Sequence, residues 1–258
     1  MRHDPCRSSR AMAPVVIVTG GNRGIGAATV RLAVSAGYAV CLSYRSHAQE
    51  ANELVADLAA QGGRVLAVSA DVANEAEVAQ LFAQADSLGP LHALVNNAGV
   101  LETQMQVADM DAARLTRVFA VNVIGSFVCA REAIHRLSTR RGGKGGSIVN
   151  VSSAASRLGS PGEYVDYAAS KGAIDTFTLG LAKEVAAEGI RVNAVRPGLI
   201  ETAIHASGGE PGRVSRLKSA VPMQRGGRPE EVAQAILWLL SDAASYCTGS
   251  LLDVSGGR

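Results

Sequence analysis

The sequence is poor in aromatic residues, in unbalanced charge and in long apolar runs. Only 4% of its 258 residues are aromatic, so Val, Leu, Ile and Ala must fill the core. The formal net charge is +2, which gives no electrostatic reason to expect nucleic acid or an anionic membrane as the main partner. No uninterrupted apolar run approaches the ~20 residues of a membrane-spanning helix. We therefore expect neither a nucleic-acid nor a membrane partner.

Closely spaced cysteines are also lacking. The four cysteines lie far apart and form no CxxC pair (Cys6, Cys41, Cys129 and Cys247). This spacing predicts neither a metal site nor a disulfide scaffold, and it favours a reduced, cytoplasmic protein. Residues 1–14 are basic and polar and have no apolar segment typical of a secretion signal. We expect them to form a disordered leader, in which Met12 is an alternative start.

After this leader, short apolar runs alternate with longer segments of helical periodicity. Strands are predicted at 15–19, 39–43, 65–68, 91–95, 147–151, 191–195 and 251–254. Helices are predicted at 25–36, 47–60, 74–87, 164–187 and 230–240, with a long helical region up to 137 that is interrupted near Gly125. Apolar strands separated by helices are typical of a parallel sheet covered on both faces. The pattern predicts an α/β fold: a single doubly wound Rossmann-type domain of about seven strands over 15–258, with its ligand crevice at the carboxyl ends of the strands.

A glycine-rich segment, TGGNRGIG at 19–26, follows the first predicted strand and opens the first helix. Glycines allow a tight turn and a close approach to a pyrophosphate, and the amides at a helix start favour that anion. The spacing differs from the common G-x-G-x-x-G, and an ordinary strand-to-helix turn remains the alternative. A second glycine-rich stretch, RRGGKGG at 140–146, is either a solvated loop or a phosphate-binding patch.

The end of the second strand indicates which dinucleotide would bind. An acidic residue there would bind a ribose 2'-hydroxyl, whereas an arginine accommodates a 2'-phosphate. The expected position holds Tyr44, Arg45 follows it, and Arg23 lies in the glycine loop. Two arginines and no carboxylate favour NADP(H) over NAD(H), although either arginine could instead be a solvated surface charge.

Tyr167 and Lys171 are four residues apart and so share one face of a predicted helix. A tyrosine, with an ordinary pKa of ~10, is a poor acid or base at neutral pH. A nearby ammonium favours the phenolate, and we expect Lys171 to lower the pKa of Tyr167 toward working pH. Taken alone, this spacing is common, and it favours a surface pair.

Several further motifs occur in order along the chain, and together they resemble the short-chain dehydrogenase/reductase family. They are TGGNRGIG at 19–26, DV at 71–72, NNAG at 96–99, VN at 121–122, SS at 152–153, YAASK at 167–171 and PG at 197–198. The resemblance covers essentially everything after Pro14. It implies an NADP-preferring oxidoreductase that acts on a carbonyl or an alcohol, of the kind that reduces sugars, polyols, ketones or 3-oxoacyl groups.

The resemblance also implies a role for each matching residue. The cofactor would contact the glycine loop, the DV and NNAG motifs, the catalytic pair and the segment after the sixth strand (Gly20, Arg23, Gly24, Ile25, Gly26, Arg45, Asp71, Val72, Asn97, Ala98, Gly99, Tyr167, Lys171, Pro197, Gly198 and Thr202). Tyr167 would be the general acid in reduction and the base in oxidation. Lys171 would tune Tyr167, Ser153 would polarise the carbonyl, and Asn122 would hold a water on the proton path.

One departure concerns the serine, which in the family usually precedes the tyrosine by about 13 positions. Here Ser153 lies 14 positions before Tyr167, and we attribute the difference to one extra residue in the loop at 156–163. Ser152 would then face the packed side of the strand. Tyr164 has no lysine four positions later, so we expect it to form a wall of the substrate pocket.

The segment 199–228 is rich in glycine and charge and resembles the mobile substrate lid of the family. His205 within it could contact substrate, act as a gate or be an exposed bystander. Glu163 and Asp166 could bind substrate hydroxyls, be solvated, or cap the helix that begins near Tyr164. The sequence names no physiological substrate and no direction of reaction.

Two apolar segments, 230–240 and 251–254, pack internally or, by resemblance, form a subunit interface of a homotetramer. The alternative to an enzyme is a sensor that binds a dinucleotide without catalysis. Such a sensor would not need Asn122, Ser153, Tyr167 or Lys171.

Overall fold

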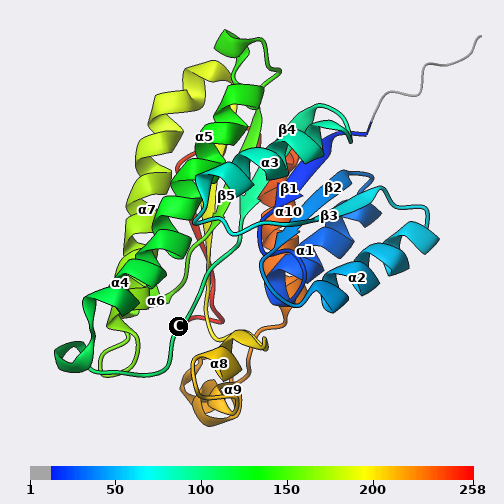
Figure 1. The fold of residues 1–258 in the computed structure, drawn as a ribbon. Helices are drawn as coiled ribbons and strands as arrows, with labels where there is room; N and C mark the ends of the chain where they lie inside the picture. Colours follow the sequence, from blue (N-terminus) through cyan, green and yellow to red (C-terminus); the bar gives the residue numbers. More distant parts are fainter. Residues whose placement is uncertain (1–12) are drawn as a thin grey trace, which may run out of the picture.

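The computed structural model describes residues 13–258 and contains a seven-stranded sheet with helices on both faces (Figure 1). All neighbouring strands are parallel, and their order is β3-β2-β1-β4-β5-β6-β7. The strands are β1 (Val15–Val18), β2 (Ala39–Tyr44), β3 (Val65–Ser69), β4 (Leu91–Asn96), β5 (Gly146–Val151), β6 (Ile190–Pro197) and β7 (Leu251–Val254). The predicted Rossmann-type α/β class is therefore confirmed.

Within residues 13–258, ten α-helices connect and cover these strands. They are α1 (Gly24–Ser35), α2 (Ala48–Ala60), α3 (Glu75–Asp86), α4 (Ala112–Phe119), α5 (Gly125–Leu137), α6 (Ala155–Leu158), α7 (Val165–Val185), α8 (Ile204–Ser207), α9 (Arg213–Leu217) and α10 (Pro229–Leu240). The leader was predicted over residues 1–14, and its first 12 residues lie outside the described residues. Pro14 already belongs to the fold, because its carbonyl accepts a hydrogen bond from the Ala39 N–H at 3.0 Å.

Two separate cores hold the helices against the sheet. Successive side chains of a strand point to opposite faces. Ile17, Leu94 and Ile148 therefore pack with α3, α5 and α7 on one face. Val16, Val95 and Val149 pack with α1, α2 and α10 on the other. Figure 1 shows the two helix layers on either side of the sheet.

The long helical region predicted up to residue 137 is interrupted by a π-helical turn, η2 (Ala120–Ile124), which joins α4 to α5. Single π turns inside helices occur frequently at functional sites. α5 then begins at Gly125, where a Cβ atom would lie 2.7 Å from Cγ2 of Val72. Only glycine permits this contact, which brings the π turn close to the loop after β3.

By length and mean hydropathy (1.3), the continuous segment Ala112–Leu137 could cross a membrane. In the fold, its inner face carries Cys129, Ala133 and Leu137, each with 0% exposure, packed against the sheet. We interpret the segment as a core helix.

The strand order places the ends of β1 and β4 side by side. Val16 of β1 pairs with Val40 of β2 on one side and with Ala93 of β4 on the other, and the order of the strands along the chain reverses there. Ligands of open α/β sheets bind outside the carboxyl ends of strands at such a switch point. The loops after β1 and β4 therefore border the expected crevice.

Candidate active site

The loop between β1 and α1 has the backbone shape of an anion cradle. Gly20 and Gly24 have φ values of 61° and 54°, in the left-handed region that favours glycine. A Cβ atom on Gly26 would lie 2.3 Å from the Gly20 carbonyl oxygen, so this position excludes any side chain. α1 starts at Gly24, and the N–H groups of a first helical turn have no carbonyl partner within the helix. These features fit the pyrophosphate of a dinucleotide.

Asn97, in the loop after β4, fastens the glycine loop in place. Its Nδ2 donates to the carbonyl oxygens of Thr19 and Gly20, both at 2.9 Å. In return, the Thr19 hydroxyl accepts the N–H groups of Asn97 and Ala98 at 3.0 Å. The two loops therefore form one rigid rim.

Two adjoining cavities lie along this rim. The first, of about 190 Å³, is lined by the predicted residues Gly20, Arg23, Gly24, Ile25, Arg45, Asp71, Val72, Asn97, Ala98, Gly99 and Thr202. The second, of about 460 Å³, is lined by Ser153, Tyr167, Lys171, Pro197 and Gly198 and shares Ile25, Asn97, Gly99 and Thr202 with the first. Because the two cavities share these four lining residues and also Ile204, they form one cleft that joins the nucleotide side to the catalytic side. Of the predicted site residues, Gly26 and Asn122 line neither cavity.

At the nucleotide end, β2 finishes at Tyr44, and Arg45 follows it at the surface. Arg45 Nη1 lies 3.5 Å from Oδ2 of Asp71, and more than half of the arginine side chain is exposed. Arg23 is also exposed and lines the same cavity. Both guanidinium groups are therefore available to an anionic group on the adenosine side.

The catalytic side brings together Tyr167 and Lys171 of α7 and Ser153, which follows β5. Lys171 is 4% exposed, and its Nζ donates to the Val151 carbonyl at 2.7 Å and lies 5.6 Å from the Tyr167 ring centroid. Burial lowers the pKa of Lys171 to about 8, while the charge of Asp175 acts in the opposite direction. The lysine is thus buried beside the tyrosine, as the i,i+4 spacing predicts, and the surface-pair alternative is wrong.

The expected depression of the Tyr167 pKa is also wrong. Burial raises the pKa of Tyr167 above its ordinary 10, and hydrogen bonding to the Ser153 hydroxyl offsets this only in part. The physical reason is that burial removes the water that would solvate a phenolate, and this loss outweighs the hydrogen bond to Ser153. The phenol is therefore protonated at neutral pH.

Asn122, in the π turn, uses its side chain to hold the loop after β4. Its Oδ1 accepts the Val100 N–H at 2.7 Å, and its Nδ2 donates to the Val100 carbonyl at 3.1 Å and to the Ser170 hydroxyl at 3.0 Å. The side chain of Asn122 therefore has a structural role, because it ties the loop after β4 to α7. The predicted water on the proton path stays a prediction.

The two serines after β5 are distinguished by their contacts. Ser152 is buried, and its hydroxyl donates to the Lys171 carbonyl at 3.1 Å. Ser153 lines the catalytic cavity, and hydrogen bonding to its hydroxyl lowers the pKa of Tyr167, against the effect of burial. Ser153 therefore fits the predicted role of polarising a carbonyl better than Ser152 does.

The segment 199–228, predicted to be a lid, carries α8 and α9, which lie together at one end of the molecule (Figure 1). Its residues Ile204, His205 and Arg213 line the catalytic cavity. Tyr164 is 3% exposed and donates its hydroxyl to the Gly208 carbonyl at 3.0 Å, so it forms a wall and holds the lid. Glu163 binds Arg213 of α9 at 2.5 Å, which lowers the pKa of that carboxyl. His205 is not an exposed bystander: it is half-buried, and Nε2 lies 2.8 Å from the Ile200 carbonyl oxygen.

The stretch 140–146 borders a different cavity, of about 1080 Å³, at the opposite end of the strands. Its N–H groups at 142, 143, 145 and 146 all donate to carbonyls of the chain. A phosphate would need N–H groups that have no other acceptor, so this stretch fits a solvated loop better than a phosphate-binding patch.

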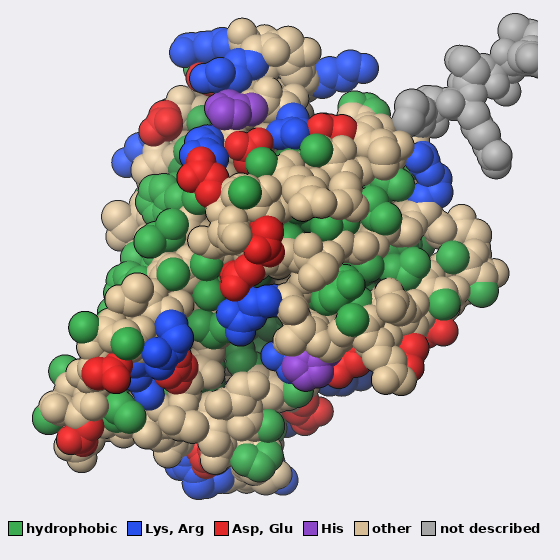
Figure 2. All heavy atoms as spheres, viewed as in Figure 1, with side chains coloured by type: hydrophobic (Ala, Val, Ile, Leu, Met, Phe, Trp, Pro, Cys, Tyr) green, Lys and Arg blue, Asp and Glu red, His purple; other side chains and the backbone are tan. Residues whose placement is uncertain are grey.

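Figure 2 shows that side chains of both charge signs are interspersed over the face it displays.

Sequence reasoning missed one buried ion pair beside the catalytic side. Asp166 neither lines the cleft nor meets solvent: its side chain is 1% exposed, and its Oδ2 lies 2.8 Å from Nε of Arg114. The two residues are 52 positions apart, and no local spacing connects them. The only available signal was that an acidic residue in the first turn of a helix often binds free N–H groups.

Comparisons with known proteins agree with this geometry. The family model described as Enoyl-(Acyl carrier protein) reductase matches residues 20–258. An uncharacterised oxidoreductase of Escherichia coli K12, YgfF, is 58% identical over 245 residues, which are 95% of this chain and 99% of that protein. A short-chain dehydrogenase/reductase from Serratia marcescens has a TM-score of 0.87 at 35% identity, with 95% of this chain and 98% of that chain covered. A blue fluorescent protein from a metagenomic library, solved in complex with NADPH, has a TM-score of 0.86 at 34% identity, with 95% and 97% covered.

Proposed function

Since the chain belongs to the short-chain dehydrogenase/reductase family, we propose that it transfers a hydride between NADP(H) and a carbonyl or secondary alcohol of a small molecule. The chain is an NAD(P)-dependent oxidoreductase of CH–OH and C=O groups. The observation that carries the finer proposal is the single cleft in which the glycine loop joins Ser153, Tyr167 and Lys171.

The bound dinucleotide supplies the hydride chemistry, and the chain's residues manage the proton and the charge. In reduction, negative charge grows on the carbonyl oxygen. Ser153 and Tyr167 donate hydrogen bonds to that oxygen, and the Tyr167 hydroxyl then delivers its proton to it. Because burial raises the pKa of Tyr167, this proton is present throughout the neutral range. In oxidation, the same oxygen of Tyr167 takes the proton of the alcohol.

Lys171 and Asn122 support the tyrosine in this proposal. The ammonium of Lys171, 5.6 Å from the ring centroid, compensates negative charge on the phenol oxygen when the proton leaves. The side chain of Asn122 binds Val100 and Ser170, and in this proposal Asn122 would hold a water on the proton path.

The preference for NADP(H) is supported by Arg23 and Arg45, which line the nucleotide end of the cleft. No carboxylate ends β2, where Tyr44 lies instead. A 2'-phosphate would be attracted by the two cations, whereas a free 2'-hydroxyl would find no carboxylate at the end of β2. A catalytic efficiency with NADH equal to that with NADPH would contradict this preference.

The catalytic cavity, of about 460 Å³, suits a small molecule. Apolar walls from Leu101, Leu158 and Ile204 alternate with the lid's Arg213 and His205. Sugars, polyols, ketones and 3-oxoacyl thioesters are the candidate substrates. Absorbance at 340 nm, followed with NADPH and a panel of these four classes, tests the proposal. Turnover of at least one class supports it, and NADPH binding without turnover of any class favours the non-catalytic sensor.

We also propose that the protein is a cytoplasmic homotetramer. The cytoplasmic location is supported by the free thiols of Cys41, Cys129 and Cys247. Two apolar faces support self-association. One, over α5 and α7, exposes Phe127 and Leu179, and the other, on α10, exposes Trp238. Light scattering should give four times the 26.6 kDa subunit mass, and a mass of one subunit would contradict the proposal.

A further inference from the structure

Tyr167 lies in the first turn of α7, where the backbone N–H groups have no hydrogen-bond acceptor within the helix. α7 begins at Val165, so the N–H of Tyr167 is among the first four, which have no acceptor within the helix. Oδ1 of Asp166 accepts this N–H at 2.9 Å. The backbone position of the tyrosine therefore depends on how firmly the Asp166 carboxylate is held.

Arg114 of α4 holds that carboxylate with two hydrogen bonds. Nε donates to Oδ2 at 2.8 Å, and Nη2 donates to Oδ1 at 3.4 Å. The side chains are 4% and 1% exposed, so water does not compete for these contacts. A two-point contact between a planar guanidinium and a carboxylate fixes orientation as well as distance.

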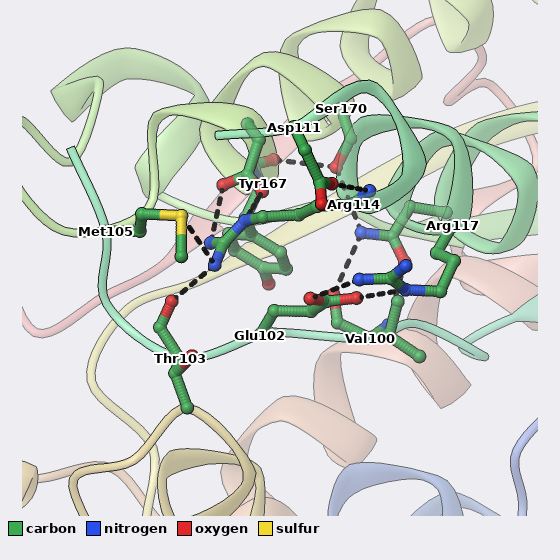
Figure 3. A network of polar contacts seen from close by, with 11 residues as sticks. Val100, Glu102, Thr103, Met105, Asp111, Arg114, Arg117, Tyr167 and Ser170 are labelled. Atoms are coloured by element: carbon green, nitrogen blue, oxygen red, sulfur yellow. Dashed lines mark hydrogen bonds and ion pairs between the residues drawn. The ribbon is translucent and has the colours of Figure 1, made fainter. Parts of the chain in front are cut away.

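The same guanidinium also reaches the loop after β4. Nη1 donates to the Thr103 carbonyl at 2.7 Å and lies 3.9 Å from the sulfur of Met105. Figure 3 shows Arg114 between this loop and the start of α7, with the Tyr167 ring beneath it. Leu101 of this loop lines the catalytic cavity, so one side chain positions both a wall of the cavity and the catalytic tyrosine.

A second contact holds the other side of the Tyr167 backbone. The Ser170 hydroxyl donates to the Tyr167 carbonyl at 2.7 Å, and it accepts a hydrogen bond from Nδ2 of Asn122 at 3.0 Å. Both the N–H and the carbonyl of Tyr167 are thus tied, through one side chain each, to the helical segment that contains Arg114 and Asn122 (Figure 3).

We infer that Arg114 and Asp166 are positioning residues for the reaction: they hold the Tyr167 hydroxyl at the distance and angle that proton transfer requires. Stability alone does not explain the pair, because apolar residues of similar volume often stabilise a fold as well as a buried ion pair does. This inference rests on the proposed role of Tyr167.

The test compares two double variants that both remove the buried charges. R114M/D166N keeps an oxygen that can accept the Tyr167 N–H, whereas R114M/D166A removes it. We expect kcat of R114M/D166A to fall by about 10- to 100-fold, because a misplacement of about 1 Å can have that effect. The KM for NADPH should stay within about threefold, since neither residue lines the nucleotide cavity. We expect R114M/D166N to recover at least fivefold in kcat over R114M/D166A.

A matched control comes from the neighbouring pair on the same helix and the same loop. Arg117 binds Glu102 through two hydrogen bonds, at 2.9 and 3.1 Å, and this pair is more exposed and does not touch the Tyr167 backbone. We expect E102Q/R117M to keep kcat within twofold of the unchanged protein.

Equal kcat in the two double variants, at any level, would overturn the inference. If R114M/D166A does not fold, amide hydrogen exchange is measured on R114M/D166N instead. Unchanged exchange over residues 164–168, together with an unchanged kcat, would overturn the inference. Faster exchange there, with the second half of α7 unaffected, would support it. Turnover that survives in Tyr167→Phe would instead remove the proposed function itself, which separates the two failures.

Discussion

Replacing Lys171 by methionine is expected to make the dinucleotide-free chain more stable at neutral pH while it abolishes turnover. Lys171 is 4% exposed, and burial lowers its pKa from 10.5 to about 8. At about 1.4 kcal/mol per pKa unit, the folded chain disfavours the charged amine by about 3 kcal/mol at pH 7. A methionine of similar length removes this penalty.

The substitution also removes a favourable contact. Nζ donates to the Val151 carbonyl at 2.7 Å, and a buried carbonyl without its donor costs about 1–3 kcal/mol. The two effects leave K171M roughly 1 kcal/mol more stable at pH 7, or about as stable as the unchanged chain at the upper end of that cost.

The pH dependence gives the sharper signature. Between pH 8 and pH 10.5, the unfolded chain retains a proton on this lysine that the folded chain has lost. The free energy of unfolding of the unchanged chain therefore gains about 2 kcal/mol between pH 7 and pH 9.5 from this group, and K171M lacks that gain.

Urea unfolding of both proteins at the two pH values, without dinucleotide, measures the difference. The m-values should agree, so that the free energies of unfolding can be compared. A stability difference between the two proteins that is the same at pH 7 and pH 9.5 would refute the reasoning. It would mean that Lys171 is not a buried charge.

Three further predictions concern the cofactor and the proton. Arg45→Glu should shift the ratio of kcat/KM for NADPH and NADH at least tenfold toward NADH, because it replaces a cation at the 2'-phosphate end by an anion; an unchanged ratio would remove Arg45 from that role. Gly26→Ala should abolish NADPH binding in a fluorescence titration, because its Cβ would lie 2.3 Å from the Gly20 carbonyl oxygen; binding within threefold of the unchanged protein would contradict the cradle. Alcohol oxidation should accelerate with rising pH to beyond pH 9 while carbonyl reduction stays flat, because the raised pKa of Tyr167 keeps its proton in place; parallel pH profiles in the two directions would argue against one shared group.

The elements that the sequence predicted well are those in which local signals agree with the fold. The helix predicted from residue 74 illustrates this: α3 begins at Glu75, and Oδ1 of Asn74 accepts the Ala76 N–H at 3.0 Å as its cap. The motifs after β1, β4 and β5 converge because parallel strands end at the same edge of the sheet. The sequence alone therefore predicted that residues of these three motifs line one cleft.

What could not be predicted depends on contacts between residues far apart in the chain. The sequence left Asp166 as a helix cap, a substrate ligand or a solvated charge, and it gave no sign of a partner in Arg114. Only the approach of α4 to the start of α7 buries the two side chains against each other. The direction of the Tyr167 pKa shift was mispredicted for the same reason. The i,i+4 spacing reveals a nearby cation, but the loss of hydration depends on how the whole cleft packs around the phenol.

The most direct test of the central claim is the turnover of Tyr167→Phe, measured with NADPH and a substrate that the unchanged protein reduces. Phenylalanine keeps the ring and removes only the hydroxyl. General acid–base catalysis contributes about 10²- to 10⁴-fold, so kcat should fall by at least about 100-fold. NADPH affinity, measured by fluorescence on the same sample, should change less than threefold. A kcat within tenfold of the unchanged protein would show that the proton comes from another group.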